Sequence, residues 1–142
     1  MRRLASILAC LGLLACADPN APVVEATALG DTRDPLGPYA VAVVVRENRE
    51  IAAVRLSFRS AEAATAEVLL MEDRGDGRFT GEIPGYPAGA ELHWFVEAED
   101  GDGNFGYAPW QAEYGDASCV DALGPEDPLP EGGAAYCFSV LP

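Results

Sequence analysis

The sequence predicts an all-β sandwich, and three observations support this fold class. Short runs rich in Val, Ile, Phe and Tyr recur at roughly ten-residue spacing, which is typical of sandwiches. Clusters of Gly, Pro, Asn and Asp separate these runs. No long segment shows the 3.6-residue periodicity of an amphipathic helix. With 142 residues, the chain has the length of one domain.

Seven strands are expected, at residues 22–28, 39–46, 51–59, 67–71, 78–83, 91–99 and 136–141. The first two (PVVEATA and YAVAVVVR) are rich in β-branched residues, with a turn-rich stretch between them. The third (IAAVRLSFR) alternates apolar and polar residues, as does an antiparallel strand with one face in water. The Ala-rich stretch 61–66 can form a helical turn but is too short for a helix to stand alone, and the fourth strand (EVLLM) follows it.

Turn residues also bound the last three strands. An Arg-Gly-Asp-Gly turn at 74–77 leads into RFTGEI, where Phe79 and Ile83 share a face. A Pro/Gly turn at 84–89 leads into ELHWFVEAE, and YCFSVL closes the set. Alternation along ELHWFVEAE places Leu92, Trp94, Val96 and Ala98 inward, and Glu91, His93, Phe95, Glu97 and Glu99 outward.

The charge of the chain argues against two classes of partner. Nine Arg, no Lys and 23 acidic residues give a net charge of −14. Phosphate binding needs clustered cations, so nucleic acid is not an expected partner. The same excess of acid argues against electrostatic docking on an anionic bilayer.

The first 16 residues read as an export signal. Arg2 and Arg3 precede an apolar run that is too short to span a bilayer as a helix. The run ends in Leu13-Leu14-Ala15-Cys16, which resembles the lipobox of bacterial lipoproteins. The resemblance implies cleavage before Cys16 and lipidation of its thiol, with the mature protein at the outer membrane or cell surface.

Two alternatives remain open at this end of the chain. Ile7-Leu8-Ala9-Cys10 has the same local form, but cleavage there leaves a short apolar region. An ordinary secretory signal with an incidental Cys is the other alternative. With Cys16 as the lipidated residue, residues 1–15 are the signal, 16–21 a short tether and 22–142 the domain.

Cys119 and Cys137 then form an even pair in an oxidising compartment, where a disulfide is the simplest interpretation. The alternative is a metal site with two Cys ligands, which needs further ligands, and no His lies nearby in the sequence. Residues 109–134 between the strands are acidic and rich in Pro and Gly. The predicted disulfide fixes this insertion to the last strand.

Residues 39–104 resemble the immunoglobulin-like and fibronectin type III-like domains of bacterial surface proteins. The residues that carry the resemblance are an aromatic strand from Arg78, a Pro-Gly turn, and a second aromatic strand that ends in Glu-Ala-Glu-Asp before Gly and Asn. It implies a single sandwich in which strand 51–59 neighbours strand 91–99. Arg55 and Arg59 would then face Glu91 and Glu97 across the two strands.

The turn Asp100-Gly-Asp102-Gly-Asn104 is a weak calcium candidate. An EF-hand is excluded, because Phe105 stands where that loop needs Gly and Gln111 where it needs Glu. A different site using Glu99, Asp100, Asp102 and Asn104 remains as a weaker hypothesis. The simpler interpretation is a hairpin turn that needs Gly and Asn for positive φ.

Four aromatic residues lie in or beside the expected loop, and exposed rings next to acids can stack on sugars. They also have a simpler interpretation, as a cover for the open end of the sandwich. These residues are Phe105, Tyr107, Trp110 and Tyr114.

No motif of a nucleophilic, zinc or phosphate-binding site is present, so neither an enzyme nor a cofactor is expected. The sequence therefore predicts an acidic envelope lipoprotein with a non-catalytic protein-binding or structural role. Its expected partners are the membrane, through the lipid anchor, and another envelope protein. A carbohydrate-binding module and a calcium-stabilised adhesion domain are the alternatives.

Overall fold

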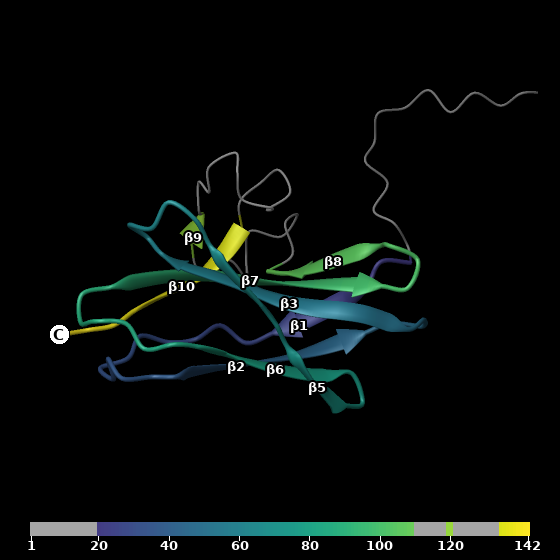
Figure 1. Ribbon diagram of the computed structural model, residues 1–142, viewed down its shortest axis with the longest axis horizontal. Helices are drawn as coiled ribbons and strands as arrows, with labels where there is room; N and C mark the ends of the chain where they lie inside the picture. The colour runs from purple at the N-terminus through teal and green to yellow at the C-terminus, as the bar shows by residue number, and fades with distance from the viewer. Residues whose placement is uncertain (1–19, 110–118, 121–133) are drawn as a thin grey trace, which may run out of the picture.

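The computed structural model describes residues 20–109, 119–120 and 134–142. Two antiparallel β-sheets lie face to face in it, so the predicted all-β sandwich is confirmed (Figure 1). Strands and their turns make up the described residues, and none of them is helical. Within the same residues, no helix has the length and apolar character needed to cross a membrane.

The first sheet has four strands in the order β1-β2-β6-β5. These are β1 (Val23–Ala26), β2 (Tyr39–Arg46), β6 (Arg78–Ile83) and β5 (Glu72–Gly75). The β5–β6 hairpin turns at Asp76 and Gly77, which have φ of 54° and 74°. Gly77 is required there for a second reason, since a Cβ would lie 2.5 Å from the Val45 carbonyl oxygen on β2.

The second sheet has six strands, with β7 (Glu91–Asp100) at its centre. On one side β7 pairs with β3 (Ile51–Ser60), and β4 (Glu67–Leu70) forms the edge beyond β3. On the other side the first half of β7 pairs with β10 (Ala134–Ser139) and the second half with β8 (Phe105–Ala108). β9 (Cys119–Val120) pairs with β10. The order β1-β2-β6-β5 over β4-β3-β7-β10 is that of an immunoglobulin-like sandwich.

The core lies between the inward faces of the two sheets. Leu56, Leu92, Trp94 and Val96 of the second sheet are fully buried, and Leu56 packs against Gly81 of the first. Tyr39 and Phe138 make an edge-to-face contact from opposite sheets, with ring centroids 5.1 Å apart. The core therefore depends on the alternation along each long strand.

The segment after β1 crosses from the first sheet to the second. The Thr32 N–H donates to the Ser139 carbonyl (3.0 Å), and the Leu141 N–H donates to the Thr32 carbonyl (2.7 Å). Asp31 Oδ1 accepts the Ser139 N–H at 2.8 Å. These bonds join the N-terminal segment to the end of β10 and close that side of the sandwich.

Three strands were missing from the sequence prediction, namely β5, β8 and β9. β5 (EDRG) is exposed along its whole length and has no apolar residue. β8 and β9 fall in the stretch interpreted as loop and insertion. Turns and bends make up the Ala-rich stretch 61–66, which is too short for a stable helix.

Two of the predicted residue environments also need correction. Phe95 faces outward with Ser57 opposite it, yet both are buried. Arg59 does not face Glu91, because the register of β3 and β7 places it opposite His93. Its Nη1 donates to the Ala63 carbonyl at 2.6 Å.

Leu56→Ala should lower the free energy of unfolding by about 2–5 kcal/mol, since it leaves a cavity between the two sheets. Leu70→Ala is the matched control, because Leu70 on the neighbouring strand is 71% exposed. The control should change the unfolding free energy by no more than about 0.5 kcal/mol. Urea unfolding followed by Trp fluorescence measures both. Equal effects of the two substitutions would contradict the assignment of faces.

Candidate functional site

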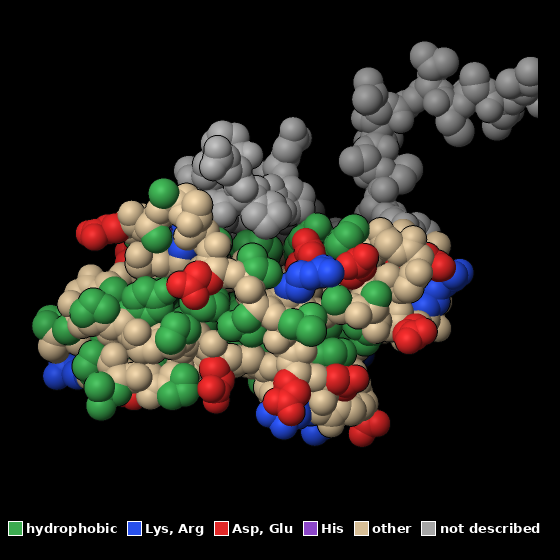
Figure 2. Space-filling view, in the orientation of Figure 1, with side chains coloured by type: hydrophobic (Ala, Val, Ile, Leu, Met, Phe, Trp, Pro, Cys, Tyr) green, Lys and Arg blue, Asp and Glu red, His purple; other side chains and the backbone are tan. Residues whose placement is uncertain are grey.

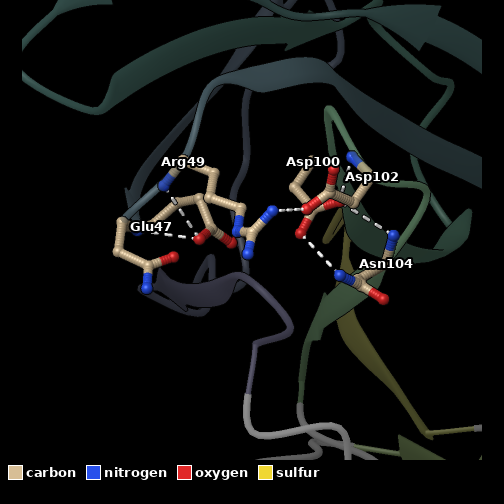
Figure 3. A network of polar contacts seen from close by, with 6 residues as sticks. Glu47, Arg49, Asp100, Asp102 and Asn104 are labelled. Carbon is tan, nitrogen blue, oxygen red and sulfur yellow. Dashed lines mark hydrogen bonds and ion pairs between the residues drawn. The ribbon is translucent and has the colours of Figure 1, made fainter.

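The turn 100–104, which the sequence offers as a calcium candidate, is held together by the Asp100 carboxylate. Asp100 Oδ1 accepts the N–H groups of Asp102 and Asn104, each at 2.9 Å, and Oδ2 accepts the Asn104 side-chain amide at 2.9 Å (Figure 3). The Asp100 N–H donates in turn to the Asn104 carbonyl. Asp100 is buried, and these three donors satisfy its oxygens.

The hairpin between β2 and β3 lies against this turn. Glu47 Oε1 accepts the N–H groups of Asn48 (2.7 Å) and Arg49 (3.1 Å), which shapes the hairpin. Arg49 then forms an ion pair with Asp102 (Figure 3). The Gly101 N–H also donates to the Glu50 carbonyl at 2.8 Å. A guanidinium therefore lies beside one of the predicted calcium ligands.

The remaining acidic candidate belongs to another ion pair. Glu99 Oε2 lies 2.9 Å from Arg55 Nη2, on the outer face of the second sheet. Each of the three carboxylates therefore has a partner within the chain, as the hairpin-turn interpretation expects. The calcium site stays a prediction that calcium titration has to test.

The Asp100 pKa lies below its ordinary value of 3.8. Burial acts in the opposite direction and favours the neutral acid, but the hydrogen bonds from Asn104 and Asp102 outweigh it, and Arg49 adds to their effect. Asp100 is therefore ionised in the folded protein and acts as the acceptor that fixes the turn.

Arg55 lies at the centre of a polar network on the outer face of the second sheet. Its Nη1 is 3.0 Å from Glu97 Oε1 and its Nη2 is 2.9 Å from Glu99 Oε2, so it bridges two positions on β7. Hydrogen bonding to Glu99 is the main cause of its raised pKa. The expected pairing of Arg55 with Glu97 is confirmed, and Glu99 joins it.

Two of the predicted sugar-stacking aromatics, Phe105 and Tyr107, lie on β8 next to this network. Tyr107 lies on β8 opposite Glu97, and its pKa is raised to about 12, first by burial and then by Glu97. The Tyr107 side chain is therefore partly buried beside Glu97. Phe105 is 41% exposed at the start of the same strand. Trp110 and Tyr114 lie outside the described residues.

A grouping that the sequence did not reveal lies at the other end of β7. His93 Nε2 is 2.6 Å from Glu91 Oε1, and Cys137 on β10 lies opposite His93. One ligand atom from each of the three residues falls within a 4.8 Å cluster. His93 is distant from Cys137 in the sequence, but the pairing of β7 with β10 places the two residues opposite each other.

Cys137 is disulfide-bonded, so its sulfur is not available as a metal-binding thiolate. β9 places the backbone of Cys119 opposite Ala135, two residues before Cys137. The Cys119 side chain lies outside the described residues. Its predicted pairing with Cys137 therefore stays a prediction, as do the lipidation of Cys16 and the role of the insertion 109–134.

Four of the described arginines form ion pairs with acidic side chains. Figure 2 shows acidic and basic side chains next to one another over β3 and again over β5. Arg46 pairs with Glu25 at 3.2 Å, and Arg74 with Glu72 at 2.8 Å. These exposed pairs each contribute about 0–1 kcal/mol to stability.

Comparison with models of known protein families finds no match for the chain. Comparison with curated proteins finds none either. The function of the protein is therefore argued from its own residues.

Asp100→Asn should lower the melting temperature at neutral pH, because it removes the charge that the three donors stabilise. A lowered pKa means that the ionised form stabilises the folded state above pH 3.8 and that this stability is lost as the pH falls through the lowered pKa. The difference between variant and wild type should therefore shrink when the pH is lowered from neutral to below 3.8. Circular dichroism melting curves at both pH values measure it.

Asp76→Asn is the control, since Asp76 is exposed at a positive-φ turn position that Asn tolerates. It should leave the melting temperature unchanged at both pH values. A penalty for Asp100→Asn that stays constant down to acid pH would show that the carboxylate charge is not what holds the turn.

Proposed function

We propose that the protein is a lipid-anchored module of the bacterial cell envelope, and that it serves a non-catalytic protein-binding or structural role. The anchor in this proposal is Cys16, and the β-sandwich is the exported part. The sequence Leu13-Leu14-Ala15-Cys16 after a short apolar run supports the anchor. Several acyl chains on one Cys give stable membrane attachment, because each buried methylene contributes about 0.8 kcal/mol.

The observation that best supports protein binding is the β4 edge of the six-stranded sheet, which pairs on one side only among the described residues. β4 is the first strand of that sheet and pairs on one side with β3. Its Val68 and Leu70 are 53% and 71% exposed on the outer face, opposite Ser57 and Arg55. An edge strand offers a row of backbone donors and acceptors to a partner strand, and exposed apolar side chains next to that row add contact area.

This edge is short, and it carries an acidic residue at its beginning. Glu67 starts β4, and Met71 just after it turns inward and is buried. A short strand limits uncontrolled edge-to-edge association, and four residues still suffice to pair with one extended segment of a partner. β4 therefore fits an extended segment of another envelope protein.

The two alternative functions remain with weaker support. Glycan binding by stacking needs exposed aromatic rings. Among the described candidates Phe105 is exposed, whereas Tyr107 is partly buried beside Glu97. A calcium-stabilised adhesion domain depends on the turn 100–104, where Arg49 lies against Asp102. Glycan arrays and calcium-dependent melting test these two functions.

Cys16→Ala should abolish incorporation of a radiolabelled fatty acid into the protein expressed in a bacterial host. The thiol is the only side chain at this position that forms the thioether to the lipid. Cys10→Ala serves as the matched control and should leave labelling unchanged. Labelling that persists in Cys16→Ala would remove the lipid anchor from the proposed function.

Val68→Lys should reduce chemical cross-linking of the protein to its envelope partner in intact cells. The substitution places a charge on the edge strand, where pairing with a partner would bury it. Leu36→Lys is the control, because Leu36 is also highly exposed but lies in the loop before β2. A cross-linked product that both variants form as well as wild type does would exclude β4 as the binding edge.

A further inference from the structure

The outward row of β2 in the first sheet is apolar over three positions, whereas the outward rows of β3 and β7 in the second sheet carry several charges. Every second residue of β2 points outward, and three of these in a row are Ala40, Ala42 and Val44. The corresponding outward positions on β3 and β7 include Arg55, Arg59 and four charged or ionisable residues of β7. An antiparallel strand with one face in water normally alternates apolar and polar residues. The run from Tyr39 to Val45 is apolar throughout, which is typical of a strand covered on both faces.

β6 lies beside β2 and presents an ordered row of side chains outward. Glu82 lies opposite Ala40, Thr80 opposite Ala42 and Arg78 opposite Val44. The row along β6 therefore runs from a cation through a hydroxyl to an anion. We call these six residues the β2–β6 face.

If a second copy of this row lies antiparallel to the first, the positive end of each row faces the negative end of the other. A two-fold axis that crosses the strands above Ala42 and Thr80 places Arg78 of one copy over Glu82 of the other, and the reverse contact follows by symmetry. The same operation places Val44 over Ala40, so that a larger side chain meets a smaller one. Sheets stacked in this way keep their strands within about 30° of each other, as in aligned sandwich packing.

The two charged residues of the β2–β6 face have no other partner in the described part of the chain. Arg46, Arg49, Arg55 and Arg74 each form an ion pair there, whereas Arg78 does not. Glu82 also has no ion pair among the described residues. Both side chains are exposed on the same face of β6, so both are available to a partner.

The face also carries two hollows, one at each end of its row. A hollow of about 510 Å³ is lined by Ala40, Ala42, Thr80 and Glu82, together with Leu70, Glu72 and Arg74. A second hollow of about 420 Å³ includes Val44 and Arg78. Arg74 Nε donates to Thr80 Oγ1 at 2.8 Å, which fixes the hydroxyl at the centre of the face.

We propose that the β2–β6 face binds a second copy of this chain about a two-fold axis through Ala42 and Thr80. The net charge of −14 repels two copies at long range, but salt screens that repulsion beyond about 8 Å at physiological ionic strength. The Arg78–Glu82 contacts, which the two-fold axis makes twice, then decide the pairing. The proposal does not rest on the lipid anchor or on the β4 edge.

Charge reversal tests it with the full-length chain purified in detergent. Wild type should sediment as a dimer in sedimentation velocity. Arg78→Glu and Glu82→Arg should each weaken self-association by at least about tenfold, because each brings like charges together at two symmetric contacts. The double variant R78E/E82R should restore the dimer.

Mixing the two single variants gives the sharpest result. One copy then carries Glu at both positions and the other Arg at both, so a heterodimer has complementary contacts and neither homodimer does. An equal mixture should therefore dimerise. Glu62→Arg, an exposed change in the loop between β3 and β4, is the control and should dimerise like wild type.

Three results would overturn the proposal. Wild type that stays monomeric at every concentration tested would show that no second copy binds. Single variants that dimerise like wild type would show that another surface is used. A mixture that stays monomeric would exclude the two-fold arrangement, provided that circular dichroism shows both variants to be folded.

Discussion

The alternation along β7 is the constraint on which the rest of the structure depends. Its inward residues, Leu92, Trp94, Val96 and Ala98, are all fully buried between the sheets. Its backbone is paired with β3 on one side and with both β10 and β8 on the other. A one-residue slip would place all four apolar side chains on the opposite face. The register of β7 therefore fixes which outward residues of the second sheet meet.

The two outer faces of the sandwich consequently differ in kind. On the second sheet, register brings Arg55 to Glu97 and Glu99, so the charges there satisfy each other. On the first sheet, β2 presents small apolar residues and β6 two charges without ion pairs in the described residues. The first arrangement pairs its charges within one sheet, and the second leaves apolar side chains and two charges exposed. The proposed contacts of the protein follow from that difference.

The sequence was most informative where one strand carries its own pattern. The bounds of 39–46 and 78–83 agree with β2 and β6, because apolar runs and turn residues mark both ends. β5 has no apolar residue, and β8 was hidden in a segment rich in Gly and aromatics, so neither has a local signal. Contacts that depend on how two strands are paired could not be predicted from the sequence of either strand alone. His93 and Cys137 are distant in the chain, and only the pairing of β7 with β10 brings them together.

Amide hydrogen exchange of the full chain followed by mass spectrometry tests the central position of β7 most directly. Because β7 is hydrogen-bonded on both sides and its inward face is buried, its amides should exchange among the slowest, together with those of β3. The amides of the edge strands β4 and β5 should exchange faster, since each pairs on one side only. Exchange of β7 as fast as that of β4 and β5 would contradict the sandwich and every surface derived from it.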